Sequence, residues 1–126
     1  MIIVKNEKEN KLILIPKIER YIHYMINLII KLPRTEKFSI GTEYKTSMYK
    51  MLENILYISK LSDKRECLEI VNKIDALLNT QRIFLRIMCK NKWIDNKKFN
   101  IVMEQIYEMG KIIGGLIKYY AKDIKK

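Results

Sequence analysis

Several residue types on which enzymes rely are scarce in this chain. Its 126 residues include one histidine (His23), two cysteines, two prolines, four glycines and one tryptophan. A lone histidine excludes any site that needs two, such as most zinc centres and di-iron bundles with paired Glu-x-x-His motifs. We interpret His23 as a surface residue, because it falls on the polar face of a predicted helix. No catalytic residue, metal or cofactor is therefore expected. So little glycine and proline also argues against a many-stranded sandwich or barrel.

The cysteines and the apolar runs bear on where the protein resides. Cys67 and Cys89 lie 22 positions apart in one predicted helix, which is about 33 Å along its axis. A disulfide requires Cα atoms within about 7 Å, so we expect two unpaired thiols that act as small buried hydrophobic residues. The longest uncharged stretch, residues 21–30, is shorter than the roughly 20 apolar residues of a membrane span. Because no signal peptide is apparent either, we expect a cytoplasmic protein.

Apolar residues and positive charge are abundant. Hydrophobic residues make up 48% of the chain, which excludes global disorder. The 25 lysines and arginines outnumber the 14 acidic residues, and the formal net charge is +11. A balance of this kind indicates an acidic partner, of which polyphosphate chains are the commonest.

Apolar residues recur with helical spacing in four segments, which cover residues 16–32, 35–61, 62–89 and 95 onward. Pro16 begins the first segment, and Pro33 ends it. Thr35 is the expected N-cap of the second, whose apolar stripe starts at Phe38. Asp63 and Asp95 are placed to begin the third and fourth helices.

Short connections between long amphipathic helices favour antiparallel neighbours. We therefore predict an all-α protein: an antiparallel up-down-up-down four-helix bundle. The predicted domain is residues 1–126, with the bundle over 16–126 and an N-terminal arm over 1–15. In that arm two apolar runs flank a polar stretch, so a small hairpin is an alternative.

Basic residues recur at helical spacing on the third and fourth helices. The third carries Arg82, Arg86 and Lys90, with Lys92 just beyond, and the fourth carries Lys111, Lys118, Lys122 and Lys125. Like charges one turn apart destabilise a helix by a few tenths of a kcal/mol per pair. We interpret these stripes as candidate nucleic-acid-binding residues that meet phosphates. The alternative is a solvated basic face.

Three glycines lie inside the fourth helix, at Gly110, Gly114 and Gly115. Each costs up to about 1 kcal/mol relative to alanine. Gly110 and Gly114 share a face, which is typical of close approach by another helix, from the same bundle or a neighbouring subunit. A kink is the alternative. A phosphate-binding loop is disfavoured, because no strand precedes the glycines and no Gly-Lys-Ser/Thr follows them.

Trp93 follows the basic run Lys90-Asn91-Lys92 in the predicted connection between the third and fourth helices. An aromatic ring beside positive charge can stack on a nucleic-acid base. The alternative is that Trp93 anchors the connection to the core.

Three ordered groups of residues resemble one known family. They are Lys31-Leu32-Pro33-Arg34-x-x-x-Phe38-x-x-Gly41, then Ile74-Asp75-x-Leu77-x-x-x-x-Arg82-x-x-x-Arg86, and finally Glu108-x-Gly110-Lys111-x-x-Gly114-Gly115-x-Ile117. The chain resembles, over roughly residues 15–120, the four-helix-bundle family of the accessory variability determinant of diversity-generating retroelements. That family also includes proteins encoded in intervening sequences of bacterial 23S ribosomal RNA genes. One position departs from the family's pattern, because Leu116 stands where the family often has tryptophan.

The resemblance implies a homopentamer without catalytic activity that binds nucleic acid, RNA with DNA as an alternative, and associates with the element's reverse transcriptase. Arg82 and Arg86 match the family's arginine pair on the third helix, and Lys111 matches its basic residue after the first glycine. An RNA-binding bundle tied to ribosomal RNA genes is the runner-up. A structural helical adaptor that never contacts nucleic acid is a third possibility.

Overall fold

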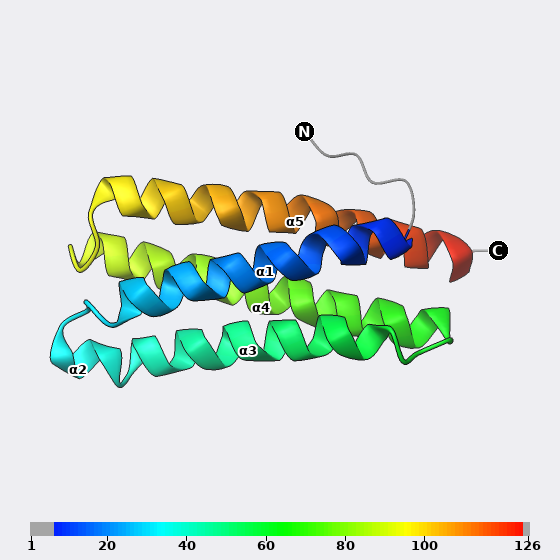
Figure 1. The fold of residues 1–126 in the computed structure, drawn as a ribbon, viewed down its shortest axis with the longest axis horizontal. Coiled ribbons are helices and arrows are strands. Elements are labelled where there is room, and N and C mark those ends of the chain that lie inside the picture. The colour runs from blue at the N-terminus through cyan, green and yellow to red at the C-terminus, as the bar shows by residue number, and fades with distance from the viewer. Residues whose placement is uncertain (1–6, 125–126) are drawn as a thin grey trace.

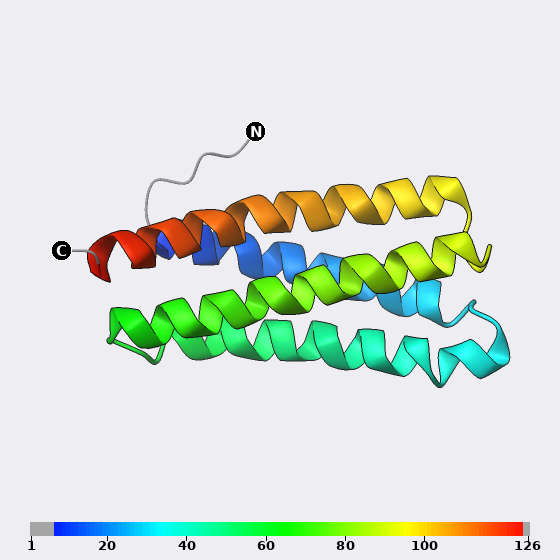
Figure 2. The ribbon, with the colours of Figure 1, turned by 180° about the vertical axis from the view of Figure 1, so that it is seen from behind.

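The structure, a computed structural model, describes residues 7–124, with side chains from Asn10 to Lys122. Over that range the chain forms four long helices and a short one, α1 (Glu7–Ile29), α2 (Arg34–Lys37), α3 (Ile40–Ile58), α4 (Lys64–Lys90) and α5 (Asn96–Ile124). The long helices lie side by side and run alternately in opposite directions (Figure 1). Each of α1 and α4 packs against α3 and α5, as the view from behind also shows (Figure 2). The predicted all-α four-helix bundle is confirmed.

The predicted arm over residues 1–15 is wrong where the structure describes it, because α1 begins at Glu7 rather than at Pro16. Residues 1–6 lie outside the described residues, so neither the arm nor the hairpin is described there. The apolar stripe continues through the proline, since Leu14 and Ile18 are both fully buried.

A proline in a helix interior leaves the carbonyl four residues earlier without its usual donor. For Pro16 that carbonyl belongs to Leu12. Leu12 is 63% exposed, and Pro16 is exposed as well. Water can therefore bind the carbonyl in place of the missing N–H. Burial of the neighbouring stripe outweighs the local cost of the proline, which is about 3 kcal/mol in an unsupported helix.

The predicted second helix is interrupted. Thr35 lies inside α2 and is not an N-cap, and Phe38, expected to begin an apolar stripe, is 75% exposed. The chain turns at Ser39 (φ −114°, ψ −89°) before α3 starts. The turn brings Gly41 against α1, where a Cβ atom would lie only 2.9 Å from Ile29 Cγ2. The predicted helix over residues 35–61 is thus broken at residues 38–39, between α2 and α3.

The beginnings of α4 and α5 follow the predicted capping residues. Asp63 Oδ1 accepts a hydrogen bond from the Arg65 backbone N–H at 2.9 Å. Asp95 Oδ1 accepts one from the Lys98 backbone N–H at 2.8 Å. Each carboxylate satisfies a donor that the first turn of a helix leaves unpaired, and its negative charge is favourable at that end of the helix dipole.

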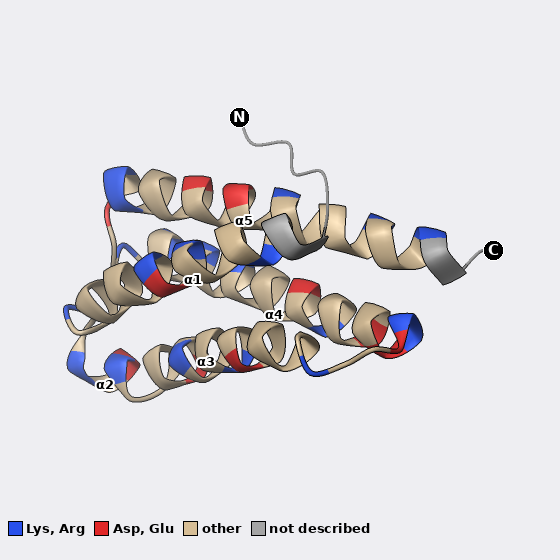
Figure 3. Cartoon of the chain, turned by 45° about the vertical axis from the view of Figure 1, so that its right-hand side comes forward, with Lys and Arg blue, Asp and Glu red and all other residues tan. Residues whose placement is uncertain are grey.

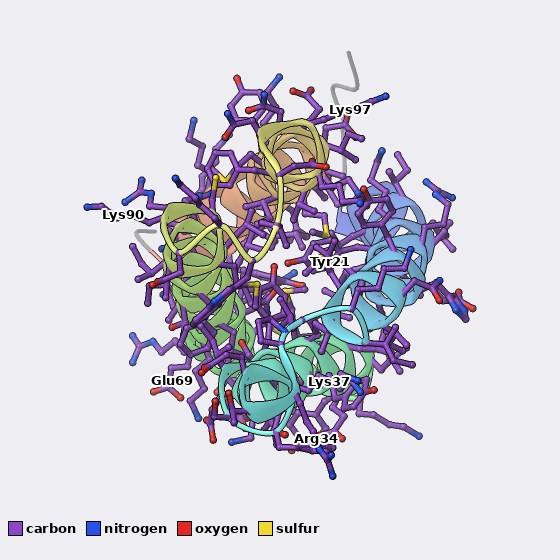
Figure 4. All side chains as sticks on the ribbon, turned by 90° about the vertical axis from the view of Figure 1, so that its left-hand side faces the viewer. Tyr21, Arg34, Lys37, Glu69, Lys90 and Lys97 are labelled. Carbon is purple, nitrogen blue, oxygen red and sulfur yellow. The ribbon has the colours of Figure 1, made fainter. Side chains whose placement is uncertain are left out.

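A chain of polar side chains crosses the apolar core. Tyr21 donates its hydroxyl hydrogen to Gln81 Oε1 (2.8 Å), and its oxygen is also hydrogen bonded to the hydroxyl of Tyr44. Gln81 Nε2 donates to Ser47 Oγ (2.9 Å), which donates to the Leu77 carbonyl (3.2 Å). Tyr21 lies in the space that the helices enclose (Figure 4). Sequence reasoning missed Gln81, which is fully buried in the apolar stripe of α4.

As predicted, Cys67 and Cys89, both on α4, are not joined by a disulfide. Cys67 is buried, whereas Cys89 is half-buried near the end of the helix. Within residues 7–124, no helix combines the length and apolar character that crossing a membrane requires.

Candidate functional site

Arg82 lies at the contact between α4 and α5. A Cβ atom on Gly110 would be 3.8 Å from Leu78 Cδ2 and 3.9 Å from Arg82 Nη2, so the guanidinium passes beside this glycine. Arg82 Nη1 donates to Asn79 Oδ1 one turn earlier on the same helix. The side chain is half-buried. These contacts hold Arg82 in place while part of its guanidinium remains exposed.

The two basic stripes meet near Arg82 and then diverge. Arg86 and Lys90 are exposed and follow Arg82 toward the connection between α4 and α5. Lys111, Lys118 and Lys122 are also exposed and run along α5 the other way. Because the helices are antiparallel, these residues span roughly 30 Å at 1.5 Å per residue. We call the set Arg82, Arg86, Lys90, Lys111, Lys118 and Lys122 the basic strip; Lys125 lies outside the described residues.

The structure thus brings together the middle of the basic strip and separates its ends. Lys111 follows Gly110 directly, and its Nζ lies 4.6 Å from the centre of the Tyr107 ring. A cation over an aromatic face is favourable and positions the ammonium group. Lys and Arg occur on all four long helices (Figure 3), so the net charge is not confined to the basic strip.

Lys92 does not continue the stripe of α4, because the helix ends before it. The Trp93 N–H donates to the Met88 carbonyl (2.9 Å), and the Lys92 N–H donates to the Cys89 carbonyl (3.0 Å). These two bonds define a Schellman motif, and Lys92 occupies its left-handed position with φ 63°. Glycine usually takes that position, since a side chain there costs about 1 kcal/mol.

A hollow of about 630 Å³ lies beside this turn, at the end of the bundle seen in Figure 4. It is lined by Leu28, Lys31, Cys89, Lys90, Lys92, Trp93, Ile94, Asp95, Asn96 and Lys98. An adjoining hollow of about 260 Å³ is lined by Tyr24, Asn27, Leu28, Lys31 and Lys98. We call the two together the end pocket. Sequence reasoning missed Lys31 and Lys98, because only folding brings α1 and α5 beside the connection.

Trp93 fits both of the interpretations that its position allowed. The residue is half-buried and packs against the hydrophobic core. It also lines the larger hollow of the end pocket. The ring therefore anchors the connection and remains partly accessible there.

The glycines of α5 do not mark a close approach within the chain. A Cβ atom on Gly110 would make only ordinary van der Waals contacts, and one on Gly114 would meet nothing within 4 Å. Gly115 is exposed, with Asn10 Nδ2 at 3.8 Å from such an atom. Within the described residues nothing packs closely on Gly114, so contact with a neighbouring subunit and a kink both stay predictions. The tight intramolecular position is Gly41, which the sequence analysis names within the family motif and not as a site of close approach.

Metal-ligating side chains do not gather in the part of the chain described. No group of three or more His, Cys, Asp and Glu residues there could hold a metal ion. His23 is exposed, as predicted.

Comparison with known proteins finds a family model that matches the chain and a crystal structure with the same fold. A family model described as bAvd-like matches residues 12–120. The crystal structure of a protein of unknown function from the S23 ribosomal protein family of Bacteroides thetaiotaomicron superposes with a TM-score of 0.79. The similarity covers 86% of this chain and 98% of that one at 14% sequence identity, so it concerns the fold alone. A search of curated protein sequences finds no match.

Proposed function

The chain belongs to the bAvd-like family, and from that premise we propose that it is a non-catalytic accessory protein of a diversity-generating retroelement. In this role it binds nucleic acid and the element's reverse transcriptase, and it supports mutagenic copying of the template RNA. Family membership is the observation that carries the proposal. The charge of +11 and the basic strip support its nucleic-acid part.

Binding through phosphates suits the residues of the basic strip. Arginine presents a planar fork of donors that matches two phosphate oxygens. Arg82 is held by Asn79 and by the α4–α5 contact, so less side-chain freedom is lost when it binds. Arg86 lies one turn further along and is exposed. We propose that this pair binds neighbouring phosphates, with Lys90, Lys111, Lys118 and Lys122 along the same path and Lys92 beyond the end of α4.

The test compares two charge-matched double variants. Arg82→Gln with Arg86→Gln removes the arginine pair, whereas Lys50→Gln with Lys73→Gln removes two exposed lysines elsewhere. Affinity for single-stranded RNA and for duplex DNA is measured by fluorescence anisotropy over a range of salt concentrations. Loss of two phosphate contacts should flatten the slope of log K against log salt by about 1.4 for single strands.

The lysine control should leave that slope nearly unchanged and should weaken binding much less. Circular dichroism confirms that both variants remain folded. Equal effects of the two variants would mean that binding depends on net charge and not on the arginine pair. No binding by the unmodified protein at low salt would leave the structural adaptor as the remaining function.

The reverse transcriptase is the second proposed partner. A subunit with a net charge of +11 is not attracted to the basic surface of an RNA-binding polymerase. We therefore place RNA between the two proteins, with the surface around Arg82 and Arg86 facing the RNA. Co-purification of the two proteins should then be lost after nuclease treatment. A complex that survives nuclease would contradict the bridging arrangement, and no complex under any condition would contradict the partnership.

We further propose a closed ring of five subunits in which Gly114 faces a neighbour. Open space beside Gly114, together with its half-exposed position on α5, supports this assignment. Copies that each carry +11 repel one another, so the ring requires extensive apolar contact. Gly114→Leu should disperse it in light-scattering measurements and leave the helical content unchanged. A monomer at every salt concentration in the unmodified protein would contradict the ring.

An RNA-binding protein tied to ribosomal RNA genes is the second candidate, which the fold shared with the S23 family member favours. The neighbouring genes separate the two candidates. A reverse transcriptase gene, with a nearby pair of repeats that differ at adenines, supports the retroelement role. A position inside a 23S ribosomal RNA gene supports the alternative.

A further inference from the structure

The end pocket concentrates positive charge from three separate elements. Lys31 comes from the turn that follows α1, Lys90 from the end of α4, and Lys98 from the first turn of α5. With Lys92 from the connection, four ammonium groups face one carboxylate in the lining of the larger hollow, that of Asp95. Mutual repulsion would be relieved by a bound anion.

The one carboxylate is already engaged. Asp95 Oδ1 accepts a hydrogen bond from the Lys98 N–H, and Asp95 Oδ2 lies 3.9 Å from Lys98 Nζ. Among the residues that the structure describes, Lys31, Lys90 and Lys92 form no ion pair. These three ammonium groups are therefore available to an anion.

An aromatic surface accompanies the charge. Trp93 is half-buried, and its backbone N–H is bound to the Met88 carbonyl, so the ring is presented from a fixed turn. Tyr24 lines the adjoining hollow. Indole and phenol rings stack on nucleic-acid bases of any sequence. The pocket thus combines a stacking surface with phosphate-binding groups.

The conformation of Lys92 is a separate observation in favour of a ligand. At φ 63° glycine would be less strained than any residue with a side chain. The Schellman motif accounts for the left-handed turn, whereas a lysine in place of glycine there is the kind of backbone strain that clusters at functional sites. Here that side chain lines the larger hollow together with three other lysines.

The volume of the larger hollow indicates the size of ligand that the end pocket can hold. Its volume of about 630 Å³ falls within the range of small-molecule sites, roughly 300–1,000 Å³. A single phosphate ion would leave most of this space and the Trp93 ring unused.

We propose that the end pocket binds one nucleotide unit, with the base on Trp93 and the phosphates among Lys31, Lys90, Lys92 and Lys98. The unit comes either from a free nucleoside phosphate or from the phosphorylated end of a strand. This site does not rest on the proposed function, although Lys90 and Lys92 also belong to the nucleic-acid-binding set given there. Its ligand can be measured without a long polymer or a polymerase.

Trp93 is the only tryptophan of the chain, so its fluorescence reports directly on the pocket. The unmodified protein is titrated with ATP, with adenosine, with pyrophosphate, and with a short oligonucleotide that does or does not carry a 5′-phosphate. Saturable quenching by ATP identifies a free nucleotide as the ligand. Saturable quenching by the 5′-phosphorylated oligonucleotide alone identifies a strand end. Quenching by neither probe, or equal affinity for pyrophosphate and ATP, overturns the proposal.

Lys92→Gly is the decisive variant, because it removes the ammonium group and also relieves the left-handed strain. We expect at least tenfold weaker binding of the nucleotide together with an unchanged or higher melting temperature. Lys73→Ala, at an exposed position elsewhere on α4, is the charge-matched control and should change the affinity less than twofold. Unchanged affinity in Lys92→Gly overturns the assignment.

Arg82→Gln with Arg86→Gln separates this proposal from the proposed function. That variant should lose affinity for long RNA and keep the nucleotide response of Trp93. Loss of both responses together would mean that the pocket is not an independent site.

Discussion

The hydroxyl of Tyr21 joins two halves of the polar chain inside the bundle. Because Tyr21 donates its hydrogen to Gln81, the hydroxyl of Tyr44 must donate to Tyr21. Tyr21→Phe therefore leaves Gln81 Oε1 without its donor and the Tyr44 hydroxyl without its acceptor, and should lower the free energy of unfolding by about 1–3 kcal/mol. Tyr44→Phe removes a donor from an oxygen that keeps its bond to Gln81, and should cost about 1 kcal/mol. Urea denaturation measures both; a larger loss in Tyr44→Phe would contradict this direction of bonding.

The same two tyrosines make stability depend on alkaline pH. Burial raises the pKa of Tyr21, which Tyr44 raises further, and burial raises the pKa of Tyr44 as well. In the unfolded chain both phenols lose their protons near pH 10. Above about pH 10 the unfolded state therefore binds fewer protons than the folded state, and stability falls by up to about 1.4 kcal/mol per pH unit for each tyrosine.

Below about pH 10 the two tyrosines contribute their full stabilisation to the folded state. Chemical denaturation between about pH 9 and 12 should show the free energy of unfolding decline with pH. In Tyr44→Phe this decline should be less steep by the amount that one tyrosine contributes. Comparison of the two proteins cancels every contribution to the pH dependence that they share. An identical slope in Tyr44→Phe would mean that Tyr44 ionises in the folded protein.

At the scale of helices, two glycines give opposite expectations for the same substitution. Gly41→Ala places a Cβ atom 2.9 Å from Ile29 Cγ2 and 3.3 Å from the Glu36 carbonyl oxygen, where α3 crosses the end of α1. We expect this overpacking to lower the free energy of unfolding by about 1–3 kcal/mol. Gly114→Ala meets nothing within 4 Å and should stabilise α5 in the isolated subunit by up to about 1 kcal/mol.

Thermal unfolding of the two alanine variants at low protein concentration distinguishes them. Destabilisation by both would mean that Gly114 is packed in the isolated chain. Destabilisation that appears only at high concentration would point to the subunit contact proposed for Gly114.

The sequence predicted helices where local chemistry and apolar spacing agree. Asp63 and Asp95 mark helix starts because each side chain binds a backbone N–H of its own first turn. Local reasoning fails where a distant contact decides. Pro16 looked like a helix start, yet α1 extends past it because the buried stripe before it packs on other helices. Gln81 was missed because its place in the apolar stripe of α4 depends on hydrogen bonds to Tyr21 and Ser47, which come from other helices.

The candidate site was likewise predictable only in part. Helical spacing alone predicted the two halves of the basic strip, and their meeting at Arg82 required the antiparallel pairing of α4 with α5. The end pocket was not predictable. Its lysines are separated by as many as 67 positions in the sequence, from Lys31 to Lys98, and the left-handed turn at Lys92 has no glycine to signal it.

At the scale of the whole molecule, the charge of +11 is spread over a bundle of only 126 residues. Repulsion among these charges destabilises the compact state, and salt screens it with a Debye length of about 10 Å at 0.1 M. The melting temperature should therefore rise as sodium chloride is added, and it should rise further with a polyanion such as heparin at equal ionic strength. Calorimetry measures both shifts. A melting temperature that falls with salt would mean that attractive ion pairs dominate.

The short connections between the long helices have a consequence for how quickly the chain folds. Within residues 7–124 the long helices that are consecutive in the sequence pack together, and the α1–α5 contact joins the two ends of the bundle's chain path. Mostly local contacts place the protein among fast-folding helical domains, which fold in microseconds to milliseconds. The α1–α5 contact must close the longest loop, so it should form last. Fast-mixing fluorescence of Trp93 would then show the α4–α5 hairpin before α1 docks, whereas a single phase would contradict this order and folding in seconds would contradict the expected rate.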